Sequence, residues 1–272
     1  FCGDAAMKSA AGPATLLYDK VNDNNGTMYN GVCLDFDETD DYIASASGVT
    51  WGVADKWTIS WWMYMDSSAL QTWFSLKQAS PDYNKIEIIT NNGVREIFAN
   101  MVDNDGTVMQ IDTDDAVWST GEWTHVVITN NGGTTTLDAI DFYINGALMS
   151  KNLLNGATQT PMTNTARTLN IGQEVGTGRN VDGKMADIRF YSVALSANNV
   201  KEIYDDSKVI IPTKNDASGG FVSQTDLKLW LPLVEGTGVD GFNVAYDGSG
   251  NGNHCDIVND SDWLTGQTGA PQ

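Results

Sequence analysis

Residues 181–206, VDGKMADIRFYSVALSANNVKEIYDD, hold the one stretch of this chain that is typical of a helix, and it directly follows a strand-like run. Ser196 is a natural N-cap, and Val200, Ile203 and Tyr204 recur at helical spacing. From about residue 31 to 189 the chain otherwise offers short alternating or apolar runs separated by Gly, Asn and Asp. The sequence therefore predicts an all-β, antiparallel two-sheet sandwich with one short helix near residues 196–205.

Composition narrows the class of partner. The chain of 272 residues has 35 Asp and Glu against 15 Lys and Arg, a formal charge of −20. A field of that sign repels phosphate backbones and anionic lipid surfaces, so we expect no nucleic-acid partner. No apolar run reaches the roughly 18 residues of a membrane helix, so we expect no membrane insertion. Cys2, Cys33 and Cys255 are too few and too scattered for a metal motif.

The C-terminal part stands apart from the strands before it. Residues 207–225 are rich in Gly, Ser, Thr and Asn and are interpreted as a linker. Residues 226–272 supply a new apolar strand, LKLWLPL, and then an Asn/Gly loop. Tyr246-Asp247 in this loop repeats the Tyr18-Asp19 pair near the N-terminus, so an internal repeat is one interpretation.

Several segments, in series, resemble the laminin-G-like and pentraxin group of the concanavalin A-like lectin and glucanase superfamily. Residues 181–206 are similar to the group's closing turn, strand and helix. The others are CLDFDETDDYIAS (33–45), WTISWWMYM (57–65), residues 122–149 with their Trp-Thr-His-Val strand, and the paired segments LWLPLVEGTG (229–238) and YDGSGNGNHCDI (246–257). The resemblance implies a concanavalin A-like jelly-roll sandwich over residues 1–206.

The order of these segments departs from the family. The strand and loop that resemble the group's opening follow its closing helix, so the opening strand is missing or displaced. Residues 226–272 then close the domain in cis, close it in a neighbouring subunit, or begin a second repeat. An open sheet edge left by the missing strand would favour self-association.

Catalysis is not expected. Glucanases of the superfamily use Glu-x-Asp-x-x-Glu, because glycoside hydrolysis needs two carboxylates at a fixed separation, and this string is absent. There is no Gly-x-Ser-x-Gly elbow, and the sequence has only two histidines. His125 lies mid-strand and is interpreted as a core residue. We therefore expect no enzyme, and a glycoside hydrolase is the least favoured function.

Calcium is the one cofactor that the sequence favours. Loops dense in Asp, Asn and Gly supply the six to eight oxygens that the ion prefers. By resemblance, the site would join Asp247 and Asn251 to the turn at Asp182, with Asp41 added. Ala186 stands where many relatives carry an acid, which leaves Asp187 as the nearest carboxylate. The alternative is that these are ordinary turn residues.

Aromatic residues offer a second type of site. Trp51, Trp73 and Trp118 lie near predicted loops or strand ends, where a ring could stack on a sugar. The alternative is that they fill the core, as expected for the other tryptophans.

Two functions remain open. The first is a non-catalytic, lectin-like binding or adhesion module, directed at carbohydrate or a surface glycan, on a secreted, cell-surface or virion-surface protein. The second is a structural or decoration protein of a larger assembly, such as a virion surface, tail appendage or extracellular filament. The fold alone does not choose between them.

Overall fold

The computed structural model describes residues 8–9, 14–17, 26–29, 33–46, 55–77, 85–91, 93–102, 108–132, 137–156, 167–174, 178–206, 226–233, 243–259 and 261–264. Trp51 and Cys2, the predicted linker 207–225 and the Tyr18-Asp19 pair lie outside these residues. Three short strands near the N-terminus form a small antiparallel sheet: β1 (Lys8–Ser9), β2 (Ala14–Leu17) and β3 (Gly26–Tyr29).

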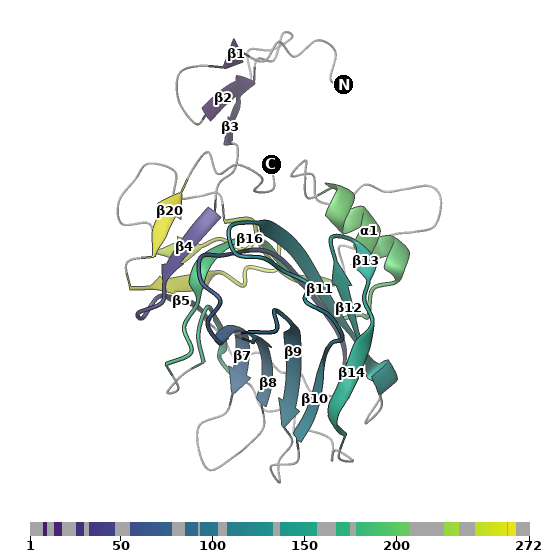
Figure 1. The fold of residues 1–272 in the computed structure, drawn as a ribbon. Helices are drawn as coiled ribbons and strands as arrows, with labels where there is room; N and C mark the ends of the chain where they lie inside the picture. The colour runs from purple at the N-terminus through teal and green to yellow at the C-terminus, as the bar shows by residue number, and fades with distance from the viewer. Residues whose placement is uncertain are drawn as a thin grey trace.

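Two large antiparallel sheets form the body of the described chain (Figure 1). The nine-stranded sheet has the order β14 (Lys151–Gly156), β10 (Val108–Thr113), β9 (Ile97–Val102), β8 (Lys85–Thr90), β7 (Gln71–Lys77), β15 (Leu169–Ile171), β5 (Tyr42–Ser45), β19 (Cys255–Val258) and β18 (Val244–Ala245). The eight-stranded sheet has the order β13 (Ala147–Leu148), β12 (Ile140–Ile144), β11 (Trp123–Asn131), β6 (Lys56–Met65), β16 (Asp182–Tyr191), β4 (Cys33–Asp37) and β20 (Asp262–Leu264), with β17 (Leu227–Leu231) also paired to β16. The predicted two-sheet antiparallel sandwich is confirmed.

The core lies between the two sheets, where alternate side chains of each strand meet. In the nine-stranded sheet Ile86 and Ile88 of β8 and Met109 and Ile111 of β10 are buried there. Trp57 and Trp61 of β6 enter the same core from the other sheet. This alternation leaves a second face on the nine-stranded sheet, opposite the core, which we call the outer face.

The single α-helix is α1 (Ala197–Asp206), close to the predicted range. The Ser196 Oγ accepts a hydrogen bond from the Asn199 N–H (3.3 Å), so Ser196 is the N-cap. Val200 and Ile203 of α1 are buried against the outside of the eight-stranded sheet. A short 3-10 helix, η1, covers Leu137–Ala139. No helix of the described residues has the length and apolar composition that a membrane crossing requires.

The C-terminal strands lie within the two sheets of their own chain. β17 pairs with β16 from Ile188 to Tyr191, where β4, the partner of the first part of β16, has ended. β19 pairs with β5, and β20 pairs with β4. The edge that we expected to be open for self-association is thus occupied by strands of the same chain. The division into domain, linker and closing segment stays a prediction, because residues 207–225 lie outside the described part.

Candidate functional site

One of the predicted calcium ligands, Asp41, lies at the turn between β4 and β5, and a second, Asp182, lies on β16 beside β4. Carboxylate oxygens of Asp37, Asp40 and Asp41 lie within 4.8 Å of one another, and we call these three residues the acidic turn. Asp182 of β16 is the cross-strand partner of Asp37. Burial raises the pKa of Asp41 to about 6, although its Oδ2 accepts a hydrogen bond from the Asp37 N–H (3.2 Å). The acidic turn is the part of the described chain where an oxygen-rich cation site could form.

Asp247 binds backbone N–H groups. Its Oδ1 accepts hydrogen bonds from the N–H groups of Trp230 (3.0 Å) and Ser249 (2.9 Å), and its Oδ2 accepts one from Asn253 N–H (2.9 Å). Asn251 donates through Nδ2 to the Leu227 carbonyl (2.8 Å). Both residues therefore hold the Asn/Gly loop against β17, and the two Asp247 oxygens that a cation would need are already engaged by N–H donors.

Asp187 is also engaged. Its two oxygens accept hydrogen bonds from Nε and a terminal nitrogen of Arg189 (both 2.8 Å), and Oδ1 accepts a third from the Trp230 indole (2.8 Å). It lies five positions after Asp182 in β16, which is roughly 16 Å of extended strand. The structure thus divides the predicted ligands between the acidic turn and the surroundings of Trp230, and one ion could not bind both groups.

The predicted tryptophan platforms are not at the surface. Trp73 is fully buried and its Nε1 donates to Thr90 Oγ1 (3.2 Å). Trp118 is 4% exposed and its Nε1 donates to the Glu96 carbonyl (3.4 Å). Both rings belong to the core between the sheets, so neither offers the open face that sugar stacking requires. Trp51 lies outside the described residues.

The outer face of the nine-stranded sheet carries a feature that the sequence did not single out. Five polar side chains lie in register on five adjacent strands, and we call them the polar row: Gln110, Asn100, Glu87, Ser75 and Asn170. They alternate along their strands with core residues, so they point away from the core. The register then continues through Ala44 to Asp256.

Oxygen atoms on this face are buried without partners. Ser75 Oγ and Asn100 Oδ1 of the polar row, and Thr72 Oγ1 and Asp112 Oδ1 beside it, make no hydrogen bond within the described part of the chain. Buried polar atoms are normally paired, because an unpaired one costs about 1–3 kcal/mol. Because these atoms are buried, a hydroxyl-bearing ligand could pair with them only after the side chains that cover them had moved.

An ionic cluster lies at the middle of the polar row. Lys85 Nζ is 3.0 Å from Glu87 Oε2 and 3.5 Å from Glu174 Oε1, and Lys77 and Arg179 also pair with Glu174. Burial and a hydrogen bond between the two carboxyl groups raise the pKa of Glu87. Burial alone would raise the pKa of Glu174, but hydrogen bonds from Glu87 and Lys77 lower it. The two carboxyl groups therefore titrate as an interacting pair.

Tyr246 is the aromatic side chain that the outer face exposes. It follows Ala245 of β18, whose side chain enters the core, and Tyr246 is 46% exposed. Its ring contacts the exposed His254 ring edge-on, with 5.2 Å between the centroids. The Asp247 N–H donates to His254 Nδ1 (3.0 Å), which places the ring proton on Nε2. The pair is thus fixed by the same loop that Asp247 orders.

His125 is a packed residue, as the sequence indicated. It is fully buried, its Nε2 lies 3.0 Å from Ser60 Oγ, and its ring contacts Trp62 and Tyr204. No ligand could reach this pair without displacing α1, so it does not form a catalytic site.

Comparisons with known proteins agree with this architecture. A family model described as the concanavalin A-like lectin/glucanases superfamily matches residues 37–201, more than half of the chain. No curated protein matches this chain significantly.

Several solved structures are similar to this chain. A protein of Bacteroides ovatus described as carbohydrate-binding is 15% identical with a TM-score of 0.57, over 93% of this chain and 68% of that one. A heptameric SAP-like pentraxin of Limulus polyphemus is 14% identical with a TM-score of 0.49, over 64% of this chain and 82% of that one. The receptor-binding domain of botulinum neurotoxin D is 15% identical with a TM-score of 0.47, over 76% of this chain and 48% of that one.

Proposed function

Because this chain belongs to the concanavalin A-like lectin/glucanase superfamily, we propose that it is a non-catalytic binding module directed at carbohydrate. We place it on a secreted protein or on a cell or virion surface. The observation that carries the proposal is the polar row with its unpaired buried oxygens, since sugar hydroxyls are the donors that those atoms lack.

The dimensions of the outer face favour an oligosaccharide over a single sugar. Adjacent strands lie about 4.8 Å apart, so the six strands from Asn100 to Asp256 span roughly 24 Å. Tyr246 and His254 stand at the β18–β19 end of this path and supply a ring face and an N–H donor. The partly exposed heads of Lys77, Lys85 and Arg179 cover the middle of the row, and these long side chains can move to admit a ligand.

Hydrolysis is not supported by the carboxyl pair of Glu87 and Glu174. Glycosidases hold their two carboxyl groups about 5–5.5 Å or 6.5–9.5 Å apart, so that a sugar or a water fits between them. Glu87 and Glu174 instead both pair with Lys85 and Arg179. Carboxylates engaged by the same cations suit a fixed polar surface.

A glycan array with the full chain tests the proposal. We expect binding to a related set of oligosaccharides and weaker signals for their monosaccharides. Silence across a broad array would overturn the carbohydrate assignment. The alternative function, a structural protein of a larger assembly, is favoured by a different observation, the exposed leucines of β13 and β14.

Calcium stays a prediction, and the acidic turn is the place that the structure offers for it. A cation bound to the folded state raises the melting midpoint, and the rise grows with the logarithm of its concentration relative to Kd. We expect the midpoint to rise with millimolar CaCl₂ relative to EDTA, and the rise to be absent in Asp40→Asn, an exposed member of the turn. Asp115→Asn, an exposed carboxylate elsewhere, is the matched control and should keep the rise.

A further inference from the structure

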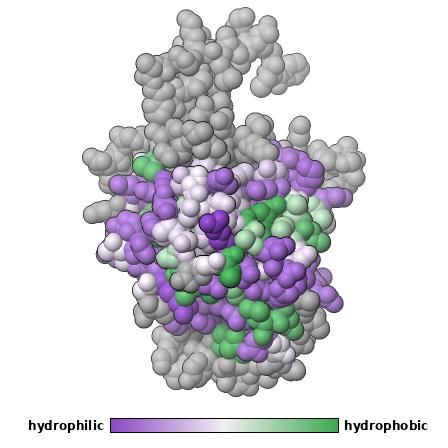
Figure 2. All heavy atoms as spheres, in the orientation of Figure 1, coloured by the Kyte–Doolittle hydropathy of each residue, from purple (hydrophilic) through white to green (hydrophobic). Residues whose placement is uncertain are grey.

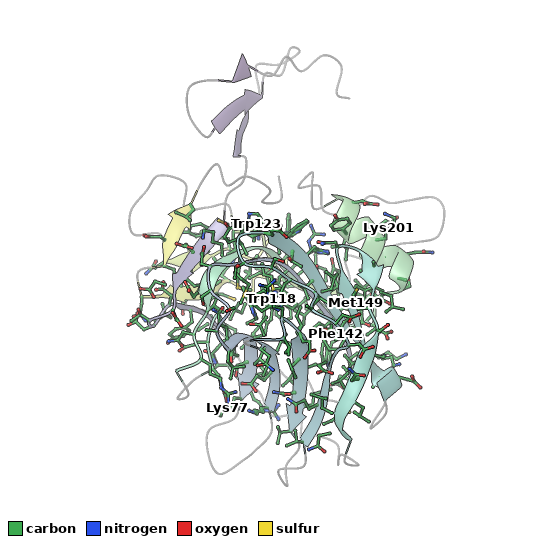
Figure 3. All side chains as sticks on the ribbon, viewed as in Figure 1. Lys77, Trp118, Trp123, Phe142, Met149 and Lys201 are labelled. Atoms are coloured by element: carbon green, nitrogen blue, oxygen red, sulfur yellow. The ribbon has the colours of Figure 1, made fainter. Side chains whose placement is uncertain are left out.

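The two large sheets end on the same side of the molecule in strands that expose leucines. β13 ends the eight-stranded sheet, β14 ends the nine-stranded sheet, and both lie on the right in Figure 1. Leu148 is 59% exposed, Leu154 53% and Leu153 39%, and these are three of the five large apolar side chains that are exposed in the described residues. Met149, labelled on this side in Figure 3, is partly buried between them and the core. We call Leu153 and Leu154, the exposed leucines of β14, the leucine edge.

Figure 2 shows hydrophobic surface over β13 and β14, within a surface that is otherwise largely hydrophilic. Exposed apolar residues that are scattered singly need no explanation, but a group on one edge marks an interaction surface. Of the strands that the structure describes, none pairs with the outer edge of β14.

β14 has little of the charge that normally protects an edge strand. Lys151 is the only charged residue in its sequence, KNLLNG. The Lys151 ammonium is already bound by Asp141 (2.7 Å) and by the Ile140 carbonyl. In a chain with 35 carboxylates, the remaining five residues of β14 carry none. Asp114 lies beside this edge, where its Oδ1 accepts a hydrogen bond from Asn152 Nδ2 (2.8 Å), but β14 itself adds no negative charge. A second copy therefore meets less repulsion at an uncharged strand than at an acidic one.

The four central residues of β14, Asn-Leu-Leu-Asn at 152–155, read the same in both directions. An antiparallel arrangement about a two-fold axis between Leu153 and Leu154 places Leu153 opposite Leu154 and Asn152 opposite Asn155 of the partner. Two-fold interfaces are self-complementary in this way, because each residue meets the same partner twice.

We propose that the leucine edge is a two-fold interface between two copies of this chain. The register of β14 on β10 shifts between Asn155 and Leu153, so Leu154 is an extra, bulged residue. The bulge interrupts a regular ladder, and the copies therefore meet through the leucine and asparagine side chains. An interface made by a few side chains of one strand is small, and small interfaces give weak, concentration-dependent dimers.

Sedimentation velocity of the full chain tests the proposal. We expect a shift from monomer to dimer between about 5 and 200 µM. The shift should be stronger in 500 mM than in 20 mM NaCl, because salt screens the repulsion between two strongly acidic copies. A monomer at every concentration in high salt overturns the proposal. Association that weakens with salt would indicate charge pairing and would overturn it as well.

Matched substitutions locate the contact. Leu154→Asp places like charges on facing copies and should leave only monomer. Val94→Asp makes the same change at an exposed apolar residue of the β8–β9 turn (46% exposed) and should leave the dimer unchanged. The proposal fails if L154D still dimerises, or if V94D abolishes the dimer equally.

Disulfide trapping tests the register. N152C and N155C are made in a Cys2→Ser background, and burial raises the pKa of Cys33 and Cys255 to about 12, so these thiols react slowly. An oxidised mixture of N152C and N155C should form a crosslinked dimer, whereas each variant alone should not. No crosslink in the mixture, or equal crosslinking of N152C alone, overturns the two-fold arrangement.

Discussion

The indole Nε1 of Trp230 donates a hydrogen bond to Oδ1 of Asp187 across 2.8 Å, which ties β17 to the bulge of β16. The same Asp187 binds Arg189, whose guanidinium lies 5.8 Å from the Trp230 ring centroid. Asp187 also adopts a left-handed φ of 49°. One carboxylate therefore holds a strained backbone, a buried cation and the C-terminal strand together.

Asp187→Asn is expected to destabilise the fold strongly. Asparagine tolerates a left-handed φ, so the substitution removes the charge without adding backbone strain. Arg189 is 5% exposed and would be left as a buried cation without its counter-ion, which costs about 3–5 kcal/mol. Urea unfolding at pH 7 measures the loss. Asp205→Asn, which breaks the exposed Lys201–Asp205 pair of α1, is the control and should cost no more than about 0.5 kcal/mol. Equal costs in the two variants would contradict the role of Asp187.

Asp247→Asn should weaken the fold in a pH-dependent way. Burial alone would raise the pKa of Asp247, but hydrogen bonds from Ser249 and from the N–H groups of Trp230 and Asn253 hold it below its usual value. A depressed pKa stabilises the fold above the unfolded value of about 3.9 and the effect is lost as pH falls through the folded value.

Denaturant unfolding at several pH values measures this effect. Asp247→Asn should cost about 1–3 kcal/mol at pH 7, and the difference from the natural chain should shrink below pH 4. Asp256→Asn removes an exposed charge nearby and should show neither change. A constant deficit of Asp247→Asn from pH 7 to pH 3 would argue against the carboxylate as the cause.

Asp112→Asn should stabilise the fold at neutral and higher pH, whereas Asp247→Asn should destabilise it. Burial, followed by the nearby Glu96, raises the pKa of Asp112 to about 6. The protonated form is favoured in the folded state, so this contribution is complete below the unfolded pKa and is lost as pH rises through about 6. Asparagine stays neutral and should stabilise the fold by up to about 2 kcal/mol at pH 8, with little gain near pH 4. Thermal melts across that range are the measurement, with Asp115→Asn as the exposed control. A variant that is less stable than the natural chain at pH 8 would refute the expectation.

The fold could be predicted because its signals are local. Alternation identifies strands such as β11, and Ser196 with its helical spacing identifies α1. The polar row could not be predicted, because Asn100 and Glu87 become neighbours only through the register of β8 on β9. Polar residues at alternate positions of these strands were a signal, but sequence does not show whether a polar face is buried.

The candidate ligands were harder to judge for a chemical reason. Asp247 and Asp41 both stand in turns rich in polar residues, where a carboxylate can bind backbone N–H groups or a cation. Asp247 binds three N–H groups, whereas Asp41 lies among other carboxylates. Trp73 and Trp118 failed as exposed platforms because closeness to a strand end does not determine which side of the sheet a ring occupies.

Tyr246→Ala is expected to reduce saccharide binding without changing the fold. The ring is 46% exposed and does not belong to the core, so its removal should leave the melting midpoint within a few degrees of the natural value. Aromatic stacking contributes about 0.5–1.5 kcal/mol, so glycan-array signals should fall roughly three- to tenfold. Val94→Ala removes a similarly exposed apolar side chain from the β8–β9 turn and should leave the signals unchanged.

Asn100→Ala removes an acceptor from the polar row and should reduce the same signals as Tyr246→Ala. Loss in Asn100→Ala alone would confine the saccharide to the centre of the row, and loss in neither variant would place it on another face of the sandwich.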